Sequence, residues 1–234
     1  MAFDVYVGPV CRYRSGDWKN VAQQAAEQHG INYQLVRPAE GLLAKLSTPK
    51  TVPTQQWRNS IREQLDASGL QDVAWDDSPE QEYVTDRPGW EGHVGFIAQF
   101  TYALHPALSP PARALTMQEL AEDPAFEIEL NLESSLAVAI LECQMFLPGT
   151  YMRAVTVPGF AGEQICVSSL RLLDLALNTI CALCAFDRVA LAQEPVDQPS
   201  SEATFEEAAR YGTAIYARLV GAALSRNLPL ILDY

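Results

Sequence analysis

The chain has 234 residues, 48% hydrophobic and 19% charged, so it can bury a substantial core and does not have the composition of a disordered protein. Its formal net charge of −13 disfavours binding to nucleic acid and to anionic lipid. No apolar stretch reaches about eighteen residues, and Asp4 interrupts the apolar N-terminus, so neither a membrane span nor a secretory signal is predicted. Five cysteines, an odd number, are typical of reduced core thiols, and we expect a cytoplasmic protein.

Charge is distributed unevenly along the chain. Residues 1–62 carry eight Lys and Arg against four Asp and Glu, whereas residues 63–234 carry eight against twenty-five. The acids also cluster, first over residues 72–91 and again over residues 119–133. A surface of this kind attracts a basic partner.

The first hundred residues predict two short strands and three helices. Alternating apolar residues predict a strand over 3–10, and a second short strand is expected over 31–36. The helices are predicted over 18–28, after a Ser15-Gly16-Asp17 cap, over 54–67, with Trp57, Ile61 and Leu65 on its buried face, and over 90–104. Residues 38–53 are predicted to form a loop.

Residues 70–89 are polar, acidic and contain proline, which predicts a long surface loop between the second and third helices. Gly92 and Gly95 lie inside the helix that follows. Since neither residue has a side chain, they allow another backbone to pack closely there.

The middle of the chain has a strong alternation, with Phe126, Ile128, Leu130 and Leu132 interleaved with Glu127, Glu129, Asn131 and Glu133. It predicts a half-buried strand with an acidic solvent face, although a helix beginning at Asp123 remains open. Further strands are predicted over 151–157 and 163–167. Pro-Gly turns at 148–149 and 158–159 favour an antiparallel meander.

Two long helices and a short strand complete the chain. Ser168 or Ser169 is predicted to cap a helix that ends near residue 186, and Thr204 with Glu207 forms a capping box for a helix over 205–225. Residues 228–232 are expected to add a strand to the sheet. The fold class is therefore α+β, with a small antiparallel sheet packed with several helices in a single domain over 1–234.

No catalytic motif stands out. His29, His93 and His105 lack the spacing of zinc ligands, and His93 is the one histidine that we consider for a functional role. Cys181 and Cys184 have the redox spacing C-x-x-C, but they come late in an apolar helix, which favours core packing. Ser168-Ser169 lacks the glycines of a nucleophile elbow, and phosphate-loop motifs are absent. We expect no catalytic residue, metal or cofactor.

The acidic segment 72–91 is the best candidate for a binding site. Aromatic side chains beside charged ones are typical of protein interfaces. The predicted partner-binding residues are Trp75, Asp76, Asp77, Glu80, Glu82, Tyr83, Asp86 and Trp90. The same carboxylates could instead ligate a hard cation or simply keep the surface solvated.

Four stretches resemble a group of poorly characterised bacterial cytoplasmic proteins, and together they cover about a third of the chain. The stretches are FDVYVGPVCRYRSGDW at 3–18, YVTDRPGWEGHVGF at 83–96, residues 146–178, and the terminal LPLILDY. Some proteins of this group accompany secreted-toxin loci as immunity-type proteins. The resemblance therefore implies a cytoplasmic protein that neutralises a cognate toxin and performs no chemistry of its own.

Three functions follow as hypotheses. The first is an immunity-type protein that occludes a cognate toxin through its acidic surface. We expect the toxin to be basic, because opposite charges speed association. The second is a metal-dependent hydrolase that uses carboxylates of 72–91 or 119–133, with His93 as acid or base. The third is a homodimer or larger oligomer in which the helices predicted over 169–186 and 205–225 pack across a two-fold axis.

Overall fold

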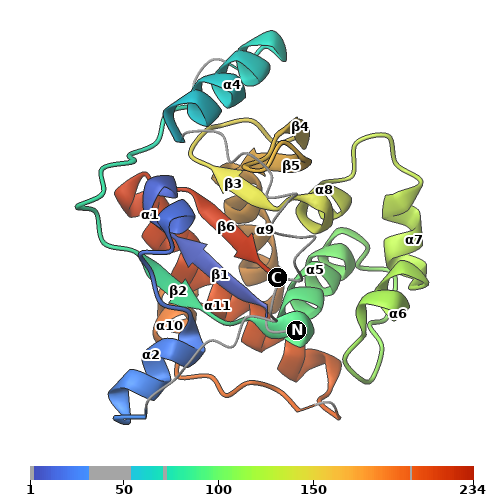
Figure 1. Cartoon of the computed structure of the whole chain (residues 1–234). Coiled ribbons are helices and arrows are strands. Elements are labelled where there is room, and N and C mark those ends of the chain that lie inside the picture. The colour runs from blue at the N-terminus through green and yellow to red at the C-terminus, as the bar shows by residue number, and fades with distance from the viewer. Residues whose placement is uncertain (1–2, 32–53, 71–72, 201) are drawn as a thin grey trace, which may run out of the picture.

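The computed structural model describes residues 3–31, 54–70, 73–200 and 202–234. These residues form an α+β fold around one mixed sheet (Figure 1). The strands are β1 (Asp4–Val7), β2 (Val84–Asp86), β3 (Met145–Leu147), β4 (Val155–Pro158), β5 (Gln164–Ser169) and β6 (Leu230–Asp233). The predicted loop over 38–53 and nearly all of the strand predicted over 31–36 lie outside the described residues.

The strand order is β2-β1-β6-β3-β5-β4, so the C-terminal strand β6 lies in the middle of the sheet. It pairs antiparallel with both β1 and β3. Strands β4 and β5 form the predicted antiparallel hairpin, but β3 pairs with β5 in parallel, Met145 lying opposite Val167. The predicted antiparallel meander is therefore wrong at β3, which joins β5 rather than its neighbour in sequence, β4.

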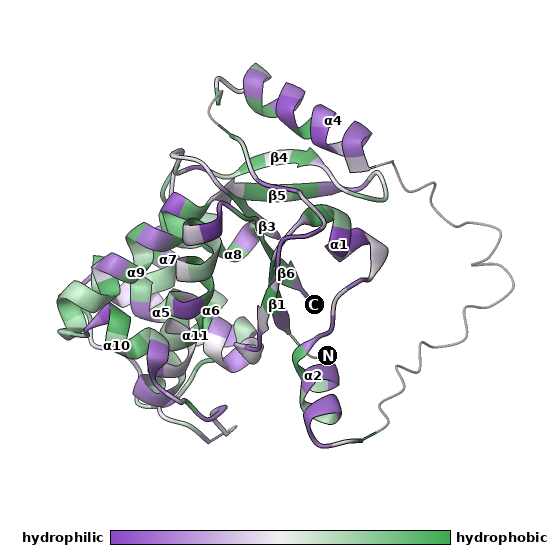
Figure 2. Ribbon diagram, turned by 90° about the vertical axis from the view of Figure 1, so that its left-hand side faces the viewer, coloured by the Kyte–Doolittle hydropathy of each residue, from purple (hydrophilic) through white to green (hydrophobic). Residues whose placement is uncertain are grey.

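Helices cover both faces of the sheet (Figure 2). The strand residues alternate between two apolar cores, because successive side chains of a strand point to opposite faces. Val5 and Val7 of β1 belong to the larger core, whereas Tyr6 between them belongs to the smaller one. The central strands are thus buried on both faces, and Asp4 is buried as well.

The larger core is built around α11 (Phe205–Arg226), which packs against α5 (Gly89–Leu104), α9 (Leu170–Cys184) and α10 (Arg188–Gln193). The predicted close packing at α5 is confirmed. A Cβ atom on Gly212 would lie 1.9 Å from the carbonyl oxygen of Gly92, and a Cβ on Gly95 would lie 2.6 Å from the backbone of Ala208. Only glycine lets these two helix backbones approach so closely.

The smaller core lies under α1 (Val10–Ser15) and α4 (Thr54–Ala67). Helix α4 has the predicted bounds and buries its predicted face of Trp57, Ile61 and Leu65. The helix predicted over 18–28 begins later, as α2 (Val21–Gln28), because Asn20 forms the capping box with Gln23. The expected cap at Ser15-Gly16 is instead the end of α1, where Gly16 has a left-handed φ of 73°.

The alternating segment after Asp123 is a helix, so the predicted strand is wrong and the helical alternative is confirmed. A carboxylate oxygen of Asp123 accepts hydrogen bonds from the N–H groups of Ala125 and Phe126, and Pro124 fixes the first turn of α7 (Pro124–Leu130). Helical rotation reverses part of the expected pattern: Glu129 is buried, while Ile128 is 42% exposed. The chain before α7 forms α6 (Met117–Ala121), and α8 (Leu136–Glu142) follows it.

The C-terminal capping box between Thr204 and Glu207 is confirmed. Ser169 is the N-cap residue of α9, as predicted, but its side chain forms no capping hydrogen bond: Ser169 and Ser168 donate their hydroxyl hydrogens to the carbonyl oxygens of Tyr151 and Arg153. Across the part of the chain that the structure describes, no helix combines the length and the apolar character that crossing a membrane requires.

Candidate functional site

The aromatic residues of segment 72–91 point into the protein rather than toward solvent. Trp75 is only 6% exposed and lies in the smaller core, with the guanidinium of Arg58 5.1 Å from the centre of its ring. Tyr83 is half-buried and stacks on Tyr6 with ring centres 5.7 Å apart. Trp90, also half-buried, stacks on Phe3 at 4.9 Å. These rings are therefore held by intramolecular packing.

Most carboxylates of the segment are also bound within the protein. Asp77 accepts hydrogen bonds from Arg58 at 3.4 Å and from the N–H of Cys11 at 3.0 Å. Asp86 pairs with Arg218 of α11. Arg12 of α1 also contacts the segment, donating to the carbonyl oxygen of Gln81 at 3.1 Å.

The other predicted partner-binding carboxylates differ in how far they are bound within the protein or exposed to solvent. Asp76 accepts hydrogen bonds from Ser78 and Gln81, at 2.8 Å each. Glu80 and Glu82 are exposed; Glu82 lies 3.9 Å from Arg226. Of the eight predicted partner-binding residues, Glu80 and Glu82 are thus the two whose side chains are mostly in solvent, and the role of the segment in binding stays a prediction.

His93, the histidine considered for a functional role, is buried in the core. His93 lies inside α5 with its Nδ1 2.6 Å from the hydroxyl of Tyr216, and burial lowers the pKa of His93 to about 3. A neutral buried imidazole fits the core interpretation. His105 forms a hydrogen bond from Nε2 to the buried carboxylate of Glu129 at 2.7 Å.

The cysteines of the C-x-x-C pair lie at the end of α9, as the sequence indicates. Burial raises the pKa of both Cys181 and Cys184, which disfavours the reactive thiolate. Cys143 and Cys166, separated by 23 positions in the sequence, meet across the sheet with their sulfur atoms 3.7 Å apart. Sequence spacing could not indicate this second pair, because β3 and β5 become neighbours only through the sheet topology.

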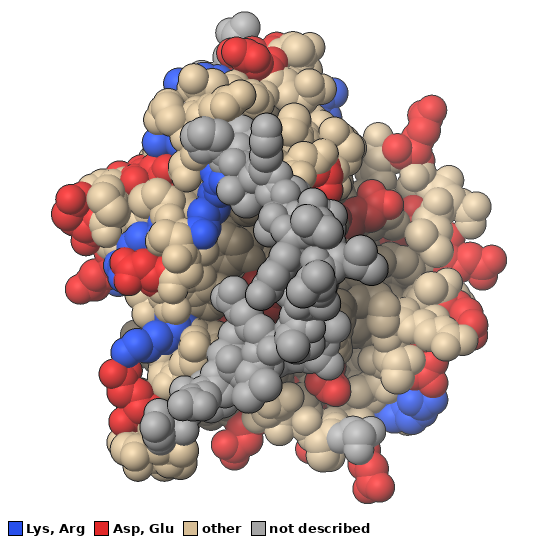
Figure 3. All heavy atoms as spheres, in the orientation of Figure 1, with Lys and Arg blue, Asp and Glu red and all other residues tan. Residues whose placement is uncertain are grey.

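The second acidic cluster, at 119–133, divides into bound and free carboxylates. Glu129 accepts a hydrogen bond from Ser135 in addition to His105, and Asp123 accepts one from the hydroxyl of Tyr102 at 2.8 Å. Glu119 is bound to Arg113, which lowers the pKa of its carboxyl group to about 2. Figure 3 shows acidic side chains predominating over α6 and α7, on the right-hand side, whereas acidic and basic side chains are mixed on the left.

A groove lies between the end of this cluster, α8 and the segment before β4. We call it the α7–α8 groove. Its volume is about 300 Å³, and it is lined by Leu132, Glu133, Ser134, Ser135, Val138, Ala139, Glu142, Met152, Arg153 and Ala154. Leu132 is 52% exposed and Met152 is 45% exposed. The sequence does not indicate this surface, because the alternation over 126–133 predicts a strand with Leu132 on its buried face.

The charges of the groove are less compensated than those of segment 72–91. Within the described residues, the carboxylates of Glu133 and Glu142 form no hydrogen bond or ion pair, and both side chains are exposed. The one cation of the lining, Arg153, donates to the backbone carbonyl of Ser68. Exposed apolar groups beside free carboxylates are suited to a contact with a surface that is both apolar and basic.

The comparisons with known proteins identify no relative. No protein-family model, no curated protein and no solved structure matches this chain. The function is therefore argued from the geometry above.

Proposed function

We propose that this protein is an immunity-type binding protein that neutralises a basic protein toxin by covering it, and that the α7–α8 groove contacts the toxin. The observation that carries the proposal is the juxtaposition of exposed Leu132 and Met152 with the free carboxylates of Glu133 and Glu142 in one concave surface. Leu132 and Met152 offer an apolar contact area, and the carboxylates select a cationic rim on the partner.

Physical reasons connect this surface with tight and fast binding. Apolar side chains that become buried in a concave contact contribute most of the affinity, whereas surrounding charges mainly set the association rate and the choice of partner. The net charge of −13 adds a long-range attraction for a basic protein. Because inhibition by coverage needs no chemistry, the buried and neutral His93 is consistent with this function.

Two other functions gain less support. The described residues include no group of three or more His, Cys, Asp or Glu side chains that could hold a metal ion, and the metal-dependent hydrolase stays a prediction without a proposed centre. The apolar faces of α9 and α11, which were expected to meet across a two-fold axis, pack against each other and against α5 within one chain.

The test is binding to candidate basic protein toxins, starting with any that is encoded beside the gene for this protein, measured by biolayer interferometry and by protection of cells that produce the toxin. We expect a stoichiometric complex and protection. The double variant Glu133→Lys/Glu142→Lys should slow association at least about tenfold at low salt. The absence of both a complex and protection would contradict the proposal.

A matched control uses the same change of charge on segment 72–91. In Glu80→Lys/Glu82→Lys, two exposed glutamates are replaced in the same way, so the long-range charge of the protein changes equally. We expect a smaller effect on association than in the groove variant. If the control variant loses binding and the groove variant keeps it, the interface lies on segment 72–91 as the sequence predicts.

A further inference from the structure

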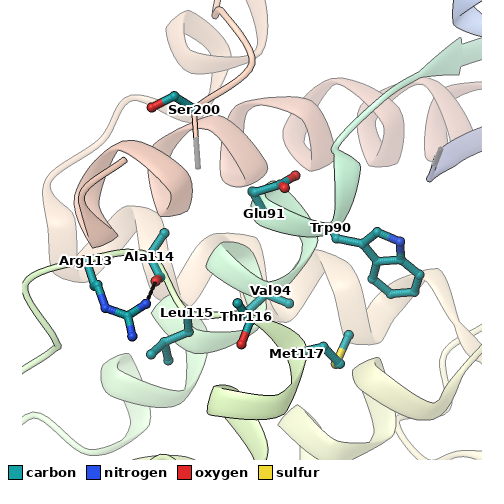
Figure 4. A pocket seen from close by; sticks show the side chains of 9 residues that line it. All are labelled: Trp90, Glu91, Val94, Arg113, Ala114, Leu115, Thr116, Met117 and Ser200. Atoms are coloured by element: carbon teal, nitrogen blue, oxygen red, sulfur yellow. Dashed lines mark hydrogen bonds between the residues drawn. The ribbon is translucent and has the colours of Figure 1, made fainter. Parts of the chain in front are cut away.

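A second and larger cavity lies at the N-terminal end of α5. Its volume is about 460 Å³, within the range of small-molecule sites. Three segments that are far apart in sequence surround it, namely the first turns of α5, residues 113–117 and Ser200 (Figure 4). The cavity shares no lining residue with the α7–α8 groove.

The walls are mainly apolar, and two of the lining residues are packed into the protein. The apolar lining residues are Trp90, Val94, Ala114, Leu115 and Met117. Trp90 is held between Phe3 and Tyr234, with ring centres 4.9 and 5.4 Å away, and Val94 is almost fully buried. A cavity with rigid walls requires little rearrangement when an apolar group enters it.

One carboxylate in the lining is uncommitted. Glu91, half-buried in the first turn of α5, forms no hydrogen bond or ion pair within the described part of the chain. The guanidinium of Arg113, also in the lining, is bound to Glu119 and to the carbonyl oxygen of Ala114. The hydroxyl of Thr116 donates to Glu119 at 3.0 Å. The local charge is therefore negative, and Glu91 is the group left to meet a ligand.

We propose that this cavity binds an organic cation with an apolar body, such as an aryl-alkyl amine, whose apolar part fills the space beside Trp90, Leu115 and Met117 while its ammonium group pairs with Glu91. The ammonium group satisfies a half-buried carboxylate, and a hydrogen bond to a charged group contributes more than one between neutral groups. An anion of the same shape is excluded by Glu91 and by the acidic surface.

Three ligands of one shape and different charge test the assignment: phenylbutylamine, phenylbutanol and phenylbutanoate. Binding is measured by calorimetry and by the fluorescence of Trp90, with Trp90→Phe identifying its signal. We expect the amine to bind about tenfold more tightly than the alcohol, and the carboxylate to show no binding. Glu91→Gln should remove the preference for the amine, whereas Glu122→Gln, which changes an exposed carboxylate outside the cavity, should preserve it.

A variant that fills the cavity tests its location. Ala114→Phe should abolish binding of both the amine and the alcohol, and Ser200→Trp, at the exposed rim, provides a second obstruction if the first variant fails to fold. Equal affinity of the wild-type protein for amine and alcohol would overturn the role of Glu91, and no binding of either at millimolar concentration would overturn the site. Either failure leaves the proposed toxin contact unaffected, because the groove and the cavity share no residue.

Discussion

The two acidic stretches of this chain resemble each other in composition and differ in what the fold does with them. In segment 72–91, Asp77 and Asp86 pair with arginines from α4 and α11, and Trp75 is part of a core. Around α7 and α8, Glu133 and Glu142 are exposed and form no ion pair within the described residues, and Leu132 is exposed beside them. Asp77, Asp86 and Trp75 are therefore part of the packed structure, whereas Glu133, Glu142 and Leu132 are exposed to solvent.

The difference shows that the charge of a sequence segment is a poor guide to the charge of a surface. Two arginines from the basic residues 1–62 contact the acidic segment 72–91: Arg58 binds Asp77, and Arg12 donates to the carbonyl oxygen of Gln81. Arg58 and Arg218 thus pair with acids of segment 72–91 that lie elsewhere in the sequence, whereas Glu133 and Glu142 form no ion pair among the residues that the structure describes.

The largest expected effect tests whether Trp75 belongs to the core. Trp75→Ala should lower the free energy of unfolding by about 3–5 kcal/mol, because it removes a large buried side chain and leaves a cavity against Trp57. Urea unfolding measures the change. Leu132→Ala, at an exposed apolar residue of the groove, should cost less than about 0.5 kcal/mol.

Trp75→Phe provides a finer test at the same position. The indole N–H of Trp75 is buried and has no acceptor among the residues that the structure describes. Phenylalanine keeps an aromatic ring and removes this unsatisfied donor, so it should cost much less than alanine. If Trp75→Ala lowered the free energy of unfolding no more than Leu132→Ala does, Trp75 would not belong to the core, and the contrast between the two stretches would not hold for this residue.

The next effect concerns a carboxylate. Asp77→Ala should destabilise the protein by about 2–3 kcal/mol, because it leaves Arg58 and the N–H of Cys11 without their acceptor. Thermal and urea unfolding of the variant measure the loss. Glu82→Ala, five residues further along, should change stability by less than about 0.5 kcal/mol since Glu82 is exposed. Equal losses in the two variants would show that the segment is not divided into bound and free acids.

Much of the fold could be predicted because local signals agreed with tertiary packing. The bounds of α4 follow from the spacing of Trp57, Ile61 and Leu65, and the start of α11 follows from its capping box. The glycines of α5 indicated close packing. In segments of this kind, the periodicity or the cap favours the same structure as the packing against the rest of the chain.

The candidate site could not be predicted for two physical reasons. The alternation over 126–133 fits a strand, but the Asp123 cap and Pro124 start a helix, which buries Glu129 and exposes Leu132. The partners of Asp77 and Asp86 come from α4 and α11, so their pairing depends on the tertiary fold. Strand β2, only three residues long, has too little pattern to be recognised within an acidic segment.

The loss of stability in mild acid separates the contribution of the buried base His93 from that of the carboxylate pairs. His93 has a pKa of about 3 in the folded protein, against about 6.5 when unfolded, so between these values the unfolded state binds one proton more. Stability contributed by the neutral imidazole is full above about pH 6.5 and is lost as the pH falls. Between pH 6.5 and 5 the free energy of unfolding should decrease by about 2 kcal/mol.

The control for this prediction replaces one histidine at a time. His93→Gln, which retains an acceptor for Tyr216, should flatten the dependence between pH 6.5 and 5, whereas His29→Gln, at an exposed residue, should preserve it. Urea unfolding at closely spaced pH values provides the measurement. A steep dependence that survives in His93→Gln would assign the acid sensitivity to the carboxylate pairs instead.

The smallest expected effect has the opposite sign and tests the free acids of the groove. Glu133→Gln/Glu142→Gln should raise the free energy of unfolding by up to about 0.5 kcal/mol at low salt. Both carboxylates lack a partner among the described residues of a protein of net charge −13, and Glu142 lies at the unfavourable C-terminal end of α8. At about 0.5 M salt the gain should vanish, since screening weakens interactions between exposed charges. Together with the loss expected for Asp77→Ala, a gain here would show that acids of one chain can stabilise the fold in one stretch and oppose it in another. A loss of more than about 1 kcal/mol would instead mean that these glutamates form native contacts.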